Sequence, residues 1–486
     1  MRYEASDLSG QPARAGAWQR RIWLVAAVLI VALAAGRLAW LPVHAPLSVN
    51  EGWNAAHVVR TFNPDTLYPD PEALIANNYP PLSFLIVGLL SKLTGDAIIA
   101  GRLVALLAQI ACGFGVAAII GRLAPGRQWK VAGCCLFGAY CVTLLRSYVA
   151  INDPQWLGDA AMVWGVFFLV PRRAGQPPSL RSIAVAAALM VAGELIKHNL
   201  VAFPIAVTLW LALFERRALV AWIAFGAAFA AIACAGVFAI WGAIAFIDVL
   251  APARSYSLAR MLAKGGPLLL AMLPVLIASR PLLAQWRGDR RLALPIVLLA
   301  VAIPLGVVQR AGSGVDVNAF FETVIALSIA VPVATALRPQ PSWRWIAISL
   351  LPALCLVPRA AAANWRELRQ RDAAVRDAAP LIAALRQARG PVACDDQAYC
   401  YWAGRESGLD FFSVKQRLLE DRAQALTPAL AEGRFALIVM RGHNPGWQEN
   451  RLIPAIRAHY RTVHARNGIE MLVPKQVSDP RSVQPN

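Results

Sequence analysis

The stretch "IWLVAAVLIVALAAGRLAWLPVHAPLSVNEGWNAAHVV" (residues 22–59) decides the fold. Its first part, residues 22–43, is apolar and long enough for a helix to cross a hydrocarbon core of about 30 Å. Its second part is a polar loop that contains one carboxylate, Glu51. Apolar runs recur as far as residue 357, and 58% of the 486 residues are hydrophobic whereas 15% are charged. The sequence therefore predicts an α-helical protein that crosses a membrane many times.

The distribution of basic residues predicts the orientation of these spans. The formal net charge is +19, but Lys and Arg lie between the apolar runs instead of gathering on one element with aromatic residues. This pattern argues against nucleic-acid binding. With residues 1–20 as a cytoplasmic tail, the basic clusters fall on alternate connections, as expected of loops retained in the cytoplasm. They are Arg122, Arg127 and Lys130; Arg172, Arg173 and Arg181; Arg216 and Arg217; Arg280, Arg287, Arg290 and Arg291; and Arg338 and Arg344.

The same pattern predicts about eleven transmembrane helices within residues 21–358, with the C-terminus outside. The predicted spans are 22–43, 97–120, 131–150, 156–170, 182–196, 199–213, 219–245, 266–279, 292–308, 320–336 and 345–357. Residues 81–93 are too short a run to span and predict an interfacial helix. A cleaved signal peptide is the alternative for the first run, but its length and the bulky Trp40 and Leu41 favour an anchor.

Residues 359–486 differ in composition and predict a small α/β domain outside the membrane. Strands are expected at 391–395, 434–442 and 469–474, and helices at 372–390 and 452–460. Two of the eight cysteines, Cys394 and Cys400, fall in this domain and would form a disulfide if the compartment is oxidising.

Polar residues concentrate on the connections predicted to lie outside. The first of these, residues 44–96, is long and aromatic, and the second is "INDPQWLGD" at 151–159. The third is the short "KHN" joint at 197–199. The fourth, 246–266, predicts an amphipathic interfacial helix, and the fifth, 309–322, is rich in glycine and polar residues. Carboxylates, amides and cations are thus expected to converge on one membrane face.

These segments, in this order, resemble a known group. An acid follows the first span, and "NYPPL" (78–82) is followed by "GDAIIAGR" (95–102), "NDPQ" (152–155), "KHN" (197–199) and "GSGVDVNAFFE" (312–322). The set resembles the GT-C superfamily of polyprenyl-phosphate-sugar-dependent glycosyltransferases. The bacterial branch related to protein O-mannosyltransferases and the lipid A aminoarabinose transferase is the most similar. The likeness covers about residues 20–340, and the ordered set carries it, since no single motif is specific.

The resemblance implies a multi-pass protein of the inner membrane with a periplasmic C-terminal domain. It implies inverting-type transfer of one sugar from a polyprenyl phosphate to a glycolipid, polysaccharide or protein outside the cytoplasm, with Glu51 at the reaction centre. The chain departs from the family where Asn50 replaces a frequent second acid. It departs again where Asn77, Asn78 and Tyr79 stand in place of an acid or histidine before the proline pair. No metal site is therefore predicted, and a divalent cation stays an alternative.

The expected chemistry needs a proton acceptor for the attacking hydroxyl and cations for the departing phosphate. Glu51 is the predicted base, since a carboxylate beside an apolar slab is desolvated and its pKa rises toward neutral. Its alternatives are a solvated loop acid and a helix N-cap. Asp153 is the second predicted catalytic acid, and its alternative is a turn formed by Asn-Asp-Pro.

The predicted phosphate-binding residues are cations and a histidine near the outer membrane face. They are Lys197, His198, Arg254, Arg260 and Arg310. Snorkelling toward the interface is the alternative for Lys197, and headgroup binding is the alternative for Arg254 and Arg260. Glu194, inside a span, is a candidate partner for Lys197 one helical turn away.

The predicted substrate groove takes aromatic and polar residues from the first and last outer loops. They are Trp53, Asn54, His57, Asn78, Tyr79, Asp316 and Asn318. Trp53 would stack on a sugar ring or belong to the interfacial aromatic belt, and Asp316 and Asn318 would contact substrate or form an ordinary turn. Two other classes compete with the transferase: a transporter or lipid flippase, which commonly shows internal repeats, and a non-catalytic envelope scaffold.

Overall fold

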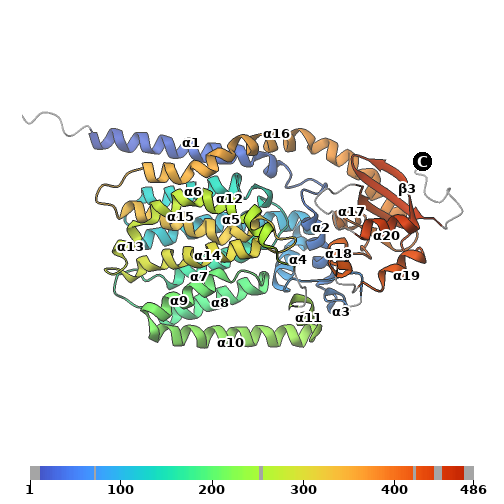
Figure 1. Ribbon diagram of the computed structural model, residues 1–486, viewed down its shortest axis with the longest axis horizontal. Coiled ribbons are helices and arrows are strands. Elements are labelled where there is room, and N and C mark those ends of the chain that lie inside the picture. Colours follow the sequence, from blue (N-terminus) through green and yellow to red (C-terminus); the bar gives the residue numbers. More distant parts are fainter. Residues whose placement is uncertain (1–10, 71–72, 251–254, 420–422, 443–450, 476–486) are drawn as a thin grey trace, which may run out of the picture.

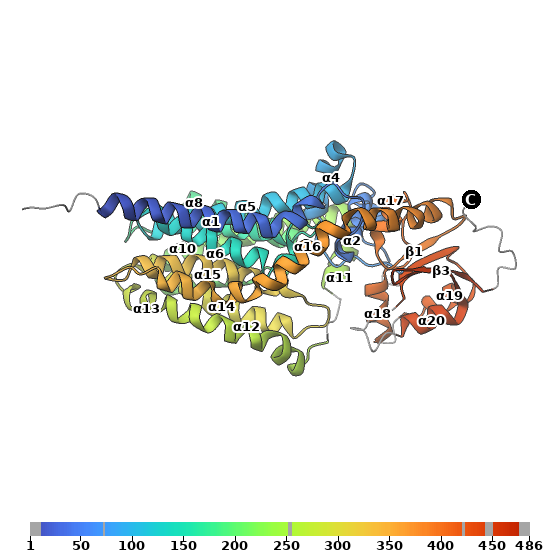
Figure 2. The same ribbon diagram turned by 90° about the horizontal axis from the view of Figure 1, so that it is seen from above.

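The computed structural model describes residues 11–70, 73–250, 255–419, 423–442 and 451–475. Its long helices run side by side along the longest axis, and a small domain with a β-sheet sits at one end of this bundle (Figure 1). The view from above shows the same arrangement, with the short helices of residues 44–96 between the bundle and the sheet (Figure 2).

The bundle contains eleven helices in the described residues, one for each predicted span. They are α1 (Gln11–Ala39), α5 (Ala97–Leu123), α6 (Arg127–Val142), α7 (Gln155–Leu169), α8 (Leu180–Ile196), α9 (Ala202–Phe214), α10 (Arg216–Trp241), α12 (Leu258–Ser279), α14 (Ala293–Arg310), α15 (Phe321–Ala336) and α16 (Arg344–Gln387). Short elements join them: η1 (Arg146–Tyr148), α11 (Ile244–Leu250), α13 (Pro281–Gln285), η2 (Arg290–Leu292) and η3 (Val317–Phe320).

Seven helices of the described chain are long and apolar enough to cross a membrane. They involve α1, α5, α10, α12, α14, α15 and α16. The other four predicted spans coincide with α6, α7, α8 and α9, which have 16, 15, 17 and 13 residues. A helix of this length is short for a hydrocarbon core of about 30 Å. The count of eleven spans thus stays a prediction, whereas a mostly helical membrane fold is established.

Helix α15 forms the centre of the bundle. Every residue from Phe321 to Thr335 is buried, and the largest apolar cluster surrounds it with side chains of α5, α6, α7, α9, α12, α14 and α16. A helix that is apolar on all sides fits either a bundle core or a lipid-facing span, and the burial of α15 places it in the core. By contrast, the hydrophobic window of α10 has no buried residue.

The first outer connection folds into three helices: α2 (Val49–Arg60), α3 (Pro64–Leu67) and α4 (Leu82–Thr94). Ser48 caps α2 by accepting a hydrogen bond from the Asn50 amide at 3.3 Å, so Glu51 is not the N-cap. Asp96 caps α5 by accepting from the amides of Ile98 and Ile99, which satisfies donors that a helix start leaves unpaired. Helix α4 matches the short helix predicted at 81–93.

The predicted interfacial helix at 246–266 is wrong in the described residues. Helix α11 ends at Leu250, residues 255–257 are not helical, and α12 begins at Leu258. Arg260 and Lys264 therefore lie in the first turns of a long apolar helix. Ser257 caps that helix by accepting a hydrogen bond from the Arg260 amide. The polar residues that predicted an interfacial helix therefore belong to the start of α12. Arg254 lies outside the described residues.

The C-terminal region contains a four-stranded sheet of order β1-β2-β4-β3. The strands are β1 (Val392–Cys394), β2 (Leu437–Arg441), β3 (Tyr460–Arg466) and β4 (Ile469–Pro474). Strand β1 pairs parallel to β2, whereas β4 is antiparallel to both of its neighbours. Helices α17 (Gln397–Trp402), α18 (Phe411–Leu419), α19 (Leu426–Ala431) and α20 (Leu452–His459) complete the region. The three predicted strands are present as β1, β2 and β4. Strand β3 was not predicted, because all of its residues except Tyr460 are exposed and the segment has no run of buried apolar residues.

The boundary predicted at residue 358 is not a break in the chain. Helix α16 runs without interruption for 44 residues and joins the last predicted span to the helix predicted at 372–390. The N-terminal part of α16 packs in the bundle, whereas Leu381 and Leu385, near its C-terminal end, are buried against the sheet. One continuous helix therefore connects the two regions.

The sulfur atoms of Cys394 and Cys400 form a disulfide. We expect that alkylation of the denatured, unreduced protein labels six of its eight cysteines, and that reduction exposes the remaining two. Mass spectrometry of the intact chain measures the difference. Labelling of all eight thiols without reductant in protein isolated from its own envelope would contradict the bond.

Candidate functional site

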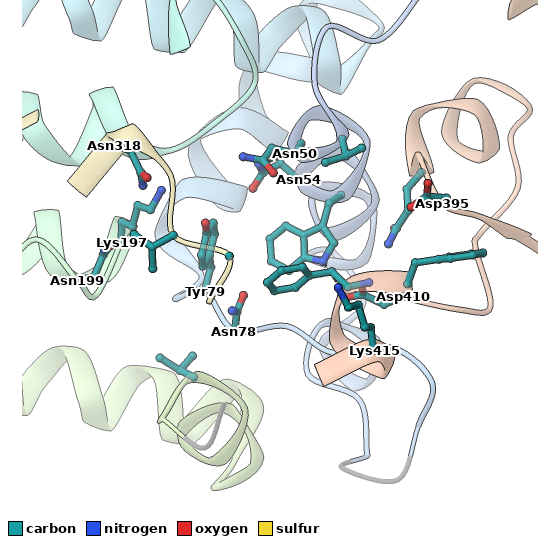
Figure 3. A pocket seen from close by; sticks show the side chains of 18 of the residues that line it. Asn50, Asn54, Asn78, Tyr79, Lys197, Asn199, Asn318, Asp395, Asp410 and Lys415 are labelled. Atoms are coloured by element: carbon teal, nitrogen blue, oxygen red, sulfur yellow. Dashed lines mark hydrogen bonds between the residues drawn. The ribbon is translucent and has the colours of Figure 1, made fainter. Parts of the chain in front are cut away.

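A cavity of about 600 Å³ lies between the C-terminal domain and the end of the bundle that faces it. Its polar lining comes from α2, the 77–81 segment, the 197–199 joint, the 309–318 loop and the C-terminal domain (Figure 3). These polar residues include Asn50, Trp53, Asn54, Asn78, Tyr79, Lys197, His198, Asn199, Gln309, Asn318, Asp395, Gln397, Asp410, Lys415 and Arg441. The segments that the sequence places on one face therefore meet around one space.

Lys197 is the buried cation of the cavity wall. It follows the last residue of α8, and its ammonium group lies 3.2 Å from Asp153 Oδ1 and 5.1 Å from the centre of the Tyr79 ring. Burial lowers the pKa of Lys197, but Asp153 and Tyr79 raise it more, and the net pKa is above its usual value. Lys197 is therefore charged at neutral pH and pairs with Asp153, not with Glu194.

Asp153 lies behind this wall and does not itself line the cavity. Its Oδ1 accepts hydrogen bonds from Lys197 and from the Gln155 amide at 2.9 Å, and its Oδ2 accepts from Asn50 Nδ2 at 3.1 Å. The contact with Gln155 is the turn expected of Asn-Asp-Pro. The turn that was the alternative for Asp153 is therefore present, and its predicted catalytic role stays a prediction.

Side-chain amides continue this network along the cavity. Asn318 donates to Gln155 Oε1 at 3.1 Å, and Gln155 donates to Asp159 at 3.0 Å. Asn54 donates to the carbonyl oxygens of Asn50 and Asn152 at 2.8 and 2.9 Å. Hydrogen-bonded amides of this kind hold their rotamers fixed and offer further donors and acceptors to a polar ligand.

Trp53 lies between the membrane domain and the C-terminal domain. Its indole Nε1 donates to Asp410 at 3.0 Å, and its ring is 5.0 Å from Tyr79 and 4.0 Å from His57. Trp53 therefore lies in the wall of the cavity, which favours a groove position over the interfacial aromatic belt. His57, by contrast, sits behind Trp53, stacked on Phe84, so the prediction that His57 lines the groove is wrong.

Glu51 does not face the cavity. Arg102 donates to both of its carboxylate oxygens, at 2.7 and 2.8 Å, and neither side chain is exposed. The amides of Leu47 and Asn152 donate to the same oxygens at 2.8 and 3.2 Å. These four donors fill the roughly four lone-pair positions of a carboxylate. The contacts therefore argue against Glu51 as a base and give it a structural role instead.

Arg102 extends this buried pair into the first outer loop. It donates to the carbonyl oxygens of Trp40 and Val43 at 2.7 Å and of Ala45 at 2.9 Å. The predicted acid and an arginine of the "GDAIIAGR" segment thus hold the loop between α1 and α2. Arg102 was not among the predicted site residues. A lone arginine in an apolar run was the available signal, because such a side chain needs an acidic or carbonyl partner.

Three other predicted site residues lie outside the cavity lining. Arg260 donates to the carbonyl oxygens of Ala311 and Ser255, and Arg310 donates to the carbonyl of Val315 and lies 3.7 Å from Asp316. Arg260 thus joins the start of α12 to the residue that follows α14, and Arg310 holds the loop after α14. The predictions of a phosphate contact for Arg260 and Arg310, and of a groove position for Asp316, are therefore not supported by their placement.

The C-terminal domain supplies cavity residues that sequence analysis did not name. They are Asp395, Gln397, Asp410, Lys415 and Arg441. Arg441 forms an ion pair with Asp395 at 2.6 Å. The available signal was the end of each predicted strand, because polar side chains beyond the carboxyl ends of parallel strands commonly form sites. No group of three or more His, Cys, Asp or Glu side chains able to hold a metal occurs among the described residues.

The buried pair of Glu51 and Arg102 predicts a stability effect. Glu51→Gln leaves Arg102 without its carboxylate, and we expect a loss of about 3–5 kcal/mol of unfolding free energy. The matched control is Asp372→Asn, because Asp372 and its partner Arg371 are both exposed and lie 3.0 Å apart, a pair worth about 0–1 kcal/mol. Thermal unfolding in detergent measures both, and equal midpoints would contradict the structural role.

Burial lowers the pKa of His57 to about 3, and nearby Arg60 adds to this shift. Because the folded pKa lies below the unfolded value of about 6.5, the contribution of neutral His57 to stability is complete above that pH. It is lost progressively as the pH falls toward 3. We expect His57→Asn to reduce the fall in melting temperature between pH 7 and pH 5, whereas the exposed His464→Asn should not. An unchanged fall in the His57 variant would refute the assignment.

Comparison with known proteins gives structural matches alone. No family model and no curated protein sequence matches the chain. ArnT from Cupriavidus metallidurans matches in the apo state, with a TM-score of 0.58 and 14% identity over 97% of this chain and 100% of that one. ArnT bound to undecaprenyl phosphate matches with 0.59 and 16% over 96% and 99%.

An oligosaccharyltransferase also matches over nearly the whole chain. The apo form of the enzyme from Archaeoglobus fulgidus has a TM-score of 0.56 and 11% identity over 95% of this chain and 75% of that one. Identities this low establish the fold and not the activity. Both regions of the chain, the helical bundle and the C-terminal domain, fall within the matched length, and the chain therefore shares its fold with these two proteins.

Proposed function

We propose that this chain is an integral-membrane glycosyltransferase. It moves one sugar from a polyprenyl phosphate to a glycolipid, polysaccharide or protein acceptor outside the cytoplasm. The observation that carries the proposal is the buried, charged Lys197 in a cavity of about 600 Å³ whose other polar groups are mostly amides and carboxylates. Similar folds occur in ArnT bound to undecaprenyl phosphate and in AglB in complex with dolichol phosphate.

Lys197 is the proposed binding group for the lipid phosphate. A lysine ammonium is a compact point charge that binds phosphate, and Asp153 holds it in place from behind. Charge at this position favours the phosphate as it leaves, because negative charge develops on its bridging oxygen. His198 and Asn199, which follow in the same joint, also line the cavity.

Asp153 is the proposed base, in place of Glu51. Three described donors reach its carboxylate, so about one of its four lone-pair positions stays open. Because Asp153 lies behind the cavity wall, the proposed path of the acceptor hydroxyl to it runs between Lys197 and Asn50. Direct attack of that hydroxyl on the sugar carbon, with departure of the lipid phosphate, inverts the configuration in a single displacement. The acceptor proton passes to Asp153, and the phosphate leaves with its negative charge beside Lys197.

The cavity volume agrees with a substrate of this size. Small-molecule sites span about 300–1,000 Å³, which accommodates one sugar and its phosphate. The lining also includes apolar residues of α11 and α20, namely Val249, Leu250, Leu452 and Ile453. We propose that the lipid chain leaves the cavity on the apolar side near α11, where the bundle presents exposed Leu250 and Ile247.

The proposed topology places the cavity outside and the opposite end of the bundle in the cytoplasm. At that opposite end Arg291 donates to the carbonyl oxygens of Arg122, Pro171 and Arg172 at 3.0–3.2 Å. Three basic connections therefore meet at one end, in agreement with the charge rule. We propose an inner-membrane protein with eleven spans and a periplasmic C-terminal domain.

The proposal predicts different effects for two neighbouring residues. Asp153→Asn should reduce the transfer rate by about 10²- to 10⁴-fold, the usual contribution of a general base, while the protein still binds undecaprenyl phosphate. Lys197→Met should weaken that binding at least about tenfold, because it removes the buried positive charge. Lys264→Met is the matched control, since Lys264 is exposed on α12 and lies away from the cavity lining.

Two measurements check these outcomes. Mass spectrometry of envelope glycans and glycolipids, with and without the gene, should show one missing sugar mass, which the Asp153 variant does not restore. Native mass spectrometry of the purified variants with undecaprenyl phosphate measures binding. Restoration of the full sugar mass by Asp153→Asn would remove Asp153 as the base, and unchanged binding in Lys197→Met would remove Lys197 from the phosphate site.

A further inference from the structure

The seven-residue segment from Cys394 to Cys400 holds a polar side chain without a described partner. Gln397 lines the cavity and is 5% exposed. Its Oε1 is buried without a hydrogen-bond partner, and neither of its amide atoms bonds to any residue that the structure describes. Buried polar groups are otherwise almost always hydrogen-bonded in proteins, because an unpaired one costs stability. Such an atom in a cavity wall is available to a ligand.

The segment is held too firmly for Gln397 to find another partner by moving. The disulfide closes its two ends, and Asp396 caps α17 by accepting from the Ala398 amide at 3.1 Å. A Cβ atom on Gly52 of α2 would lie 1.9 Å from the Ala398 nitrogen, so the backbones of α2 and α17 are in direct contact. Gln397 is therefore fixed against the helix that carries Trp53.

The same segment is attached to the membrane domain on a second side. The Ala97 amide donates to the Tyr401 hydroxyl at 2.7 Å, and the Trp402 indole donates to Asp96 at 2.9 Å. Both contacts involve the start of α5, which also carries Arg102. The position of Gln397 is thus fixed relative to the bundle, although it belongs to the C-terminal domain.

A second unpaired acceptor lies in the same cavity. Asn54 is 3% exposed, and its Nδ2 donates to two carbonyl oxygens, which fixes the orientation of its amide and leaves Oδ1 buried without a partner. Asn54 and Gln397 come from the two domains that enclose the cavity. Acceptors on both sides of the cavity suit a ligand that carries several hydroxyl donors.

We propose that Gln397 is a specificity-determining residue that binds neighbouring hydroxyl groups of the sugar on the lipid phosphate. Its amide presents an acceptor and a donor side by side, a pair that matches two adjacent ring hydroxyls. This inference rests on the proposed function and adds the sugar-reading residue to it. The donor sugar is favoured over an acceptor sugar because it is covalently attached to the phosphate that Lys197 binds in the same cavity.

The test measures how well the purified full-length protein distinguishes lipid-linked sugars. The probes are undecaprenyl phosphate without a sugar and its glucosyl, mannosyl, galactosyl and arabinosyl esters, and native mass spectrometry gives their relative affinities. Gln397→Met removes the amide but keeps the side-chain length, and it breaks no hydrogen bond to a described residue. We expect unchanged binding of the sugar-free lipid and a loss of about tenfold or more in the preference for the favoured ester.

The controls separate this inference from the proposed function. Gln416→Met, on α18 and outside the cavity lining, should retain the full preference, and Gln397→Asn, which withdraws the amide by one methylene, should lose most of it. Full preference in Gln397→Met would overturn the inference, as would an equal loss of binding for all probes. An unchanged preference with a slower transfer would assign Gln397 to the acceptor instead. Failure of the wild type to bind any probe would contradict the proposed function itself.

Discussion

The buried ion pair of Glu51 and Arg102 is the constraint on which the outer end of the molecule depends. Arg102 lies in α5, inside the bundle, and it binds Glu51 in α2 and four carbonyl oxygens of the segment that leaves α1. Charges removed from water in this way are stable only when every donor and acceptor is satisfied. Because the pair fixes α2, it also fixes Asn50 and Trp53, which face the cavity from the same helix.

The cavity depends equally on the C-terminal domain. Contacts through Gly52, Asp96 and Trp53 join α17 and α18 to the first outer loop. The continuous helix α16 provides a covalent link between bundle and sheet. A domain attached at this many points forms part of the site wall and not a separate module. Asp395, Gln397 and Asp410 consequently enter the cavity from the last quarter of the chain.

Much of this arrangement was predictable from the sequence because length, hydropathy and charge act locally. The apolar runs located all eleven bundle helices, and the alternation of Arg clusters indicated which loops share a side. The role of Glu51 was not predictable, because it depends on Arg102, which lies 51 positions away. The helix predicted at 246–266 failed for a related reason, since the amphipathic pattern of Arg260 and Lys264 does not distinguish an interfacial helix from the start of a span.

The four acids around the cavity differ in the number of hydrogen-bond donors that they already accept, and this difference orders their roles. From the residues that the structure describes, Glu51 and Asp410 each accept four, Asp153 accepts three, and Asp395 accepts two from Arg441. A carboxylate whose lone pairs are all occupied cannot take a proton without losing a bond. Glu51 and Asp410 therefore hold structure, whereas Asp153 and Asp395 retain capacity for substrate. Of these two, Asp153 is the proposed base, because it also holds Lys197 in place.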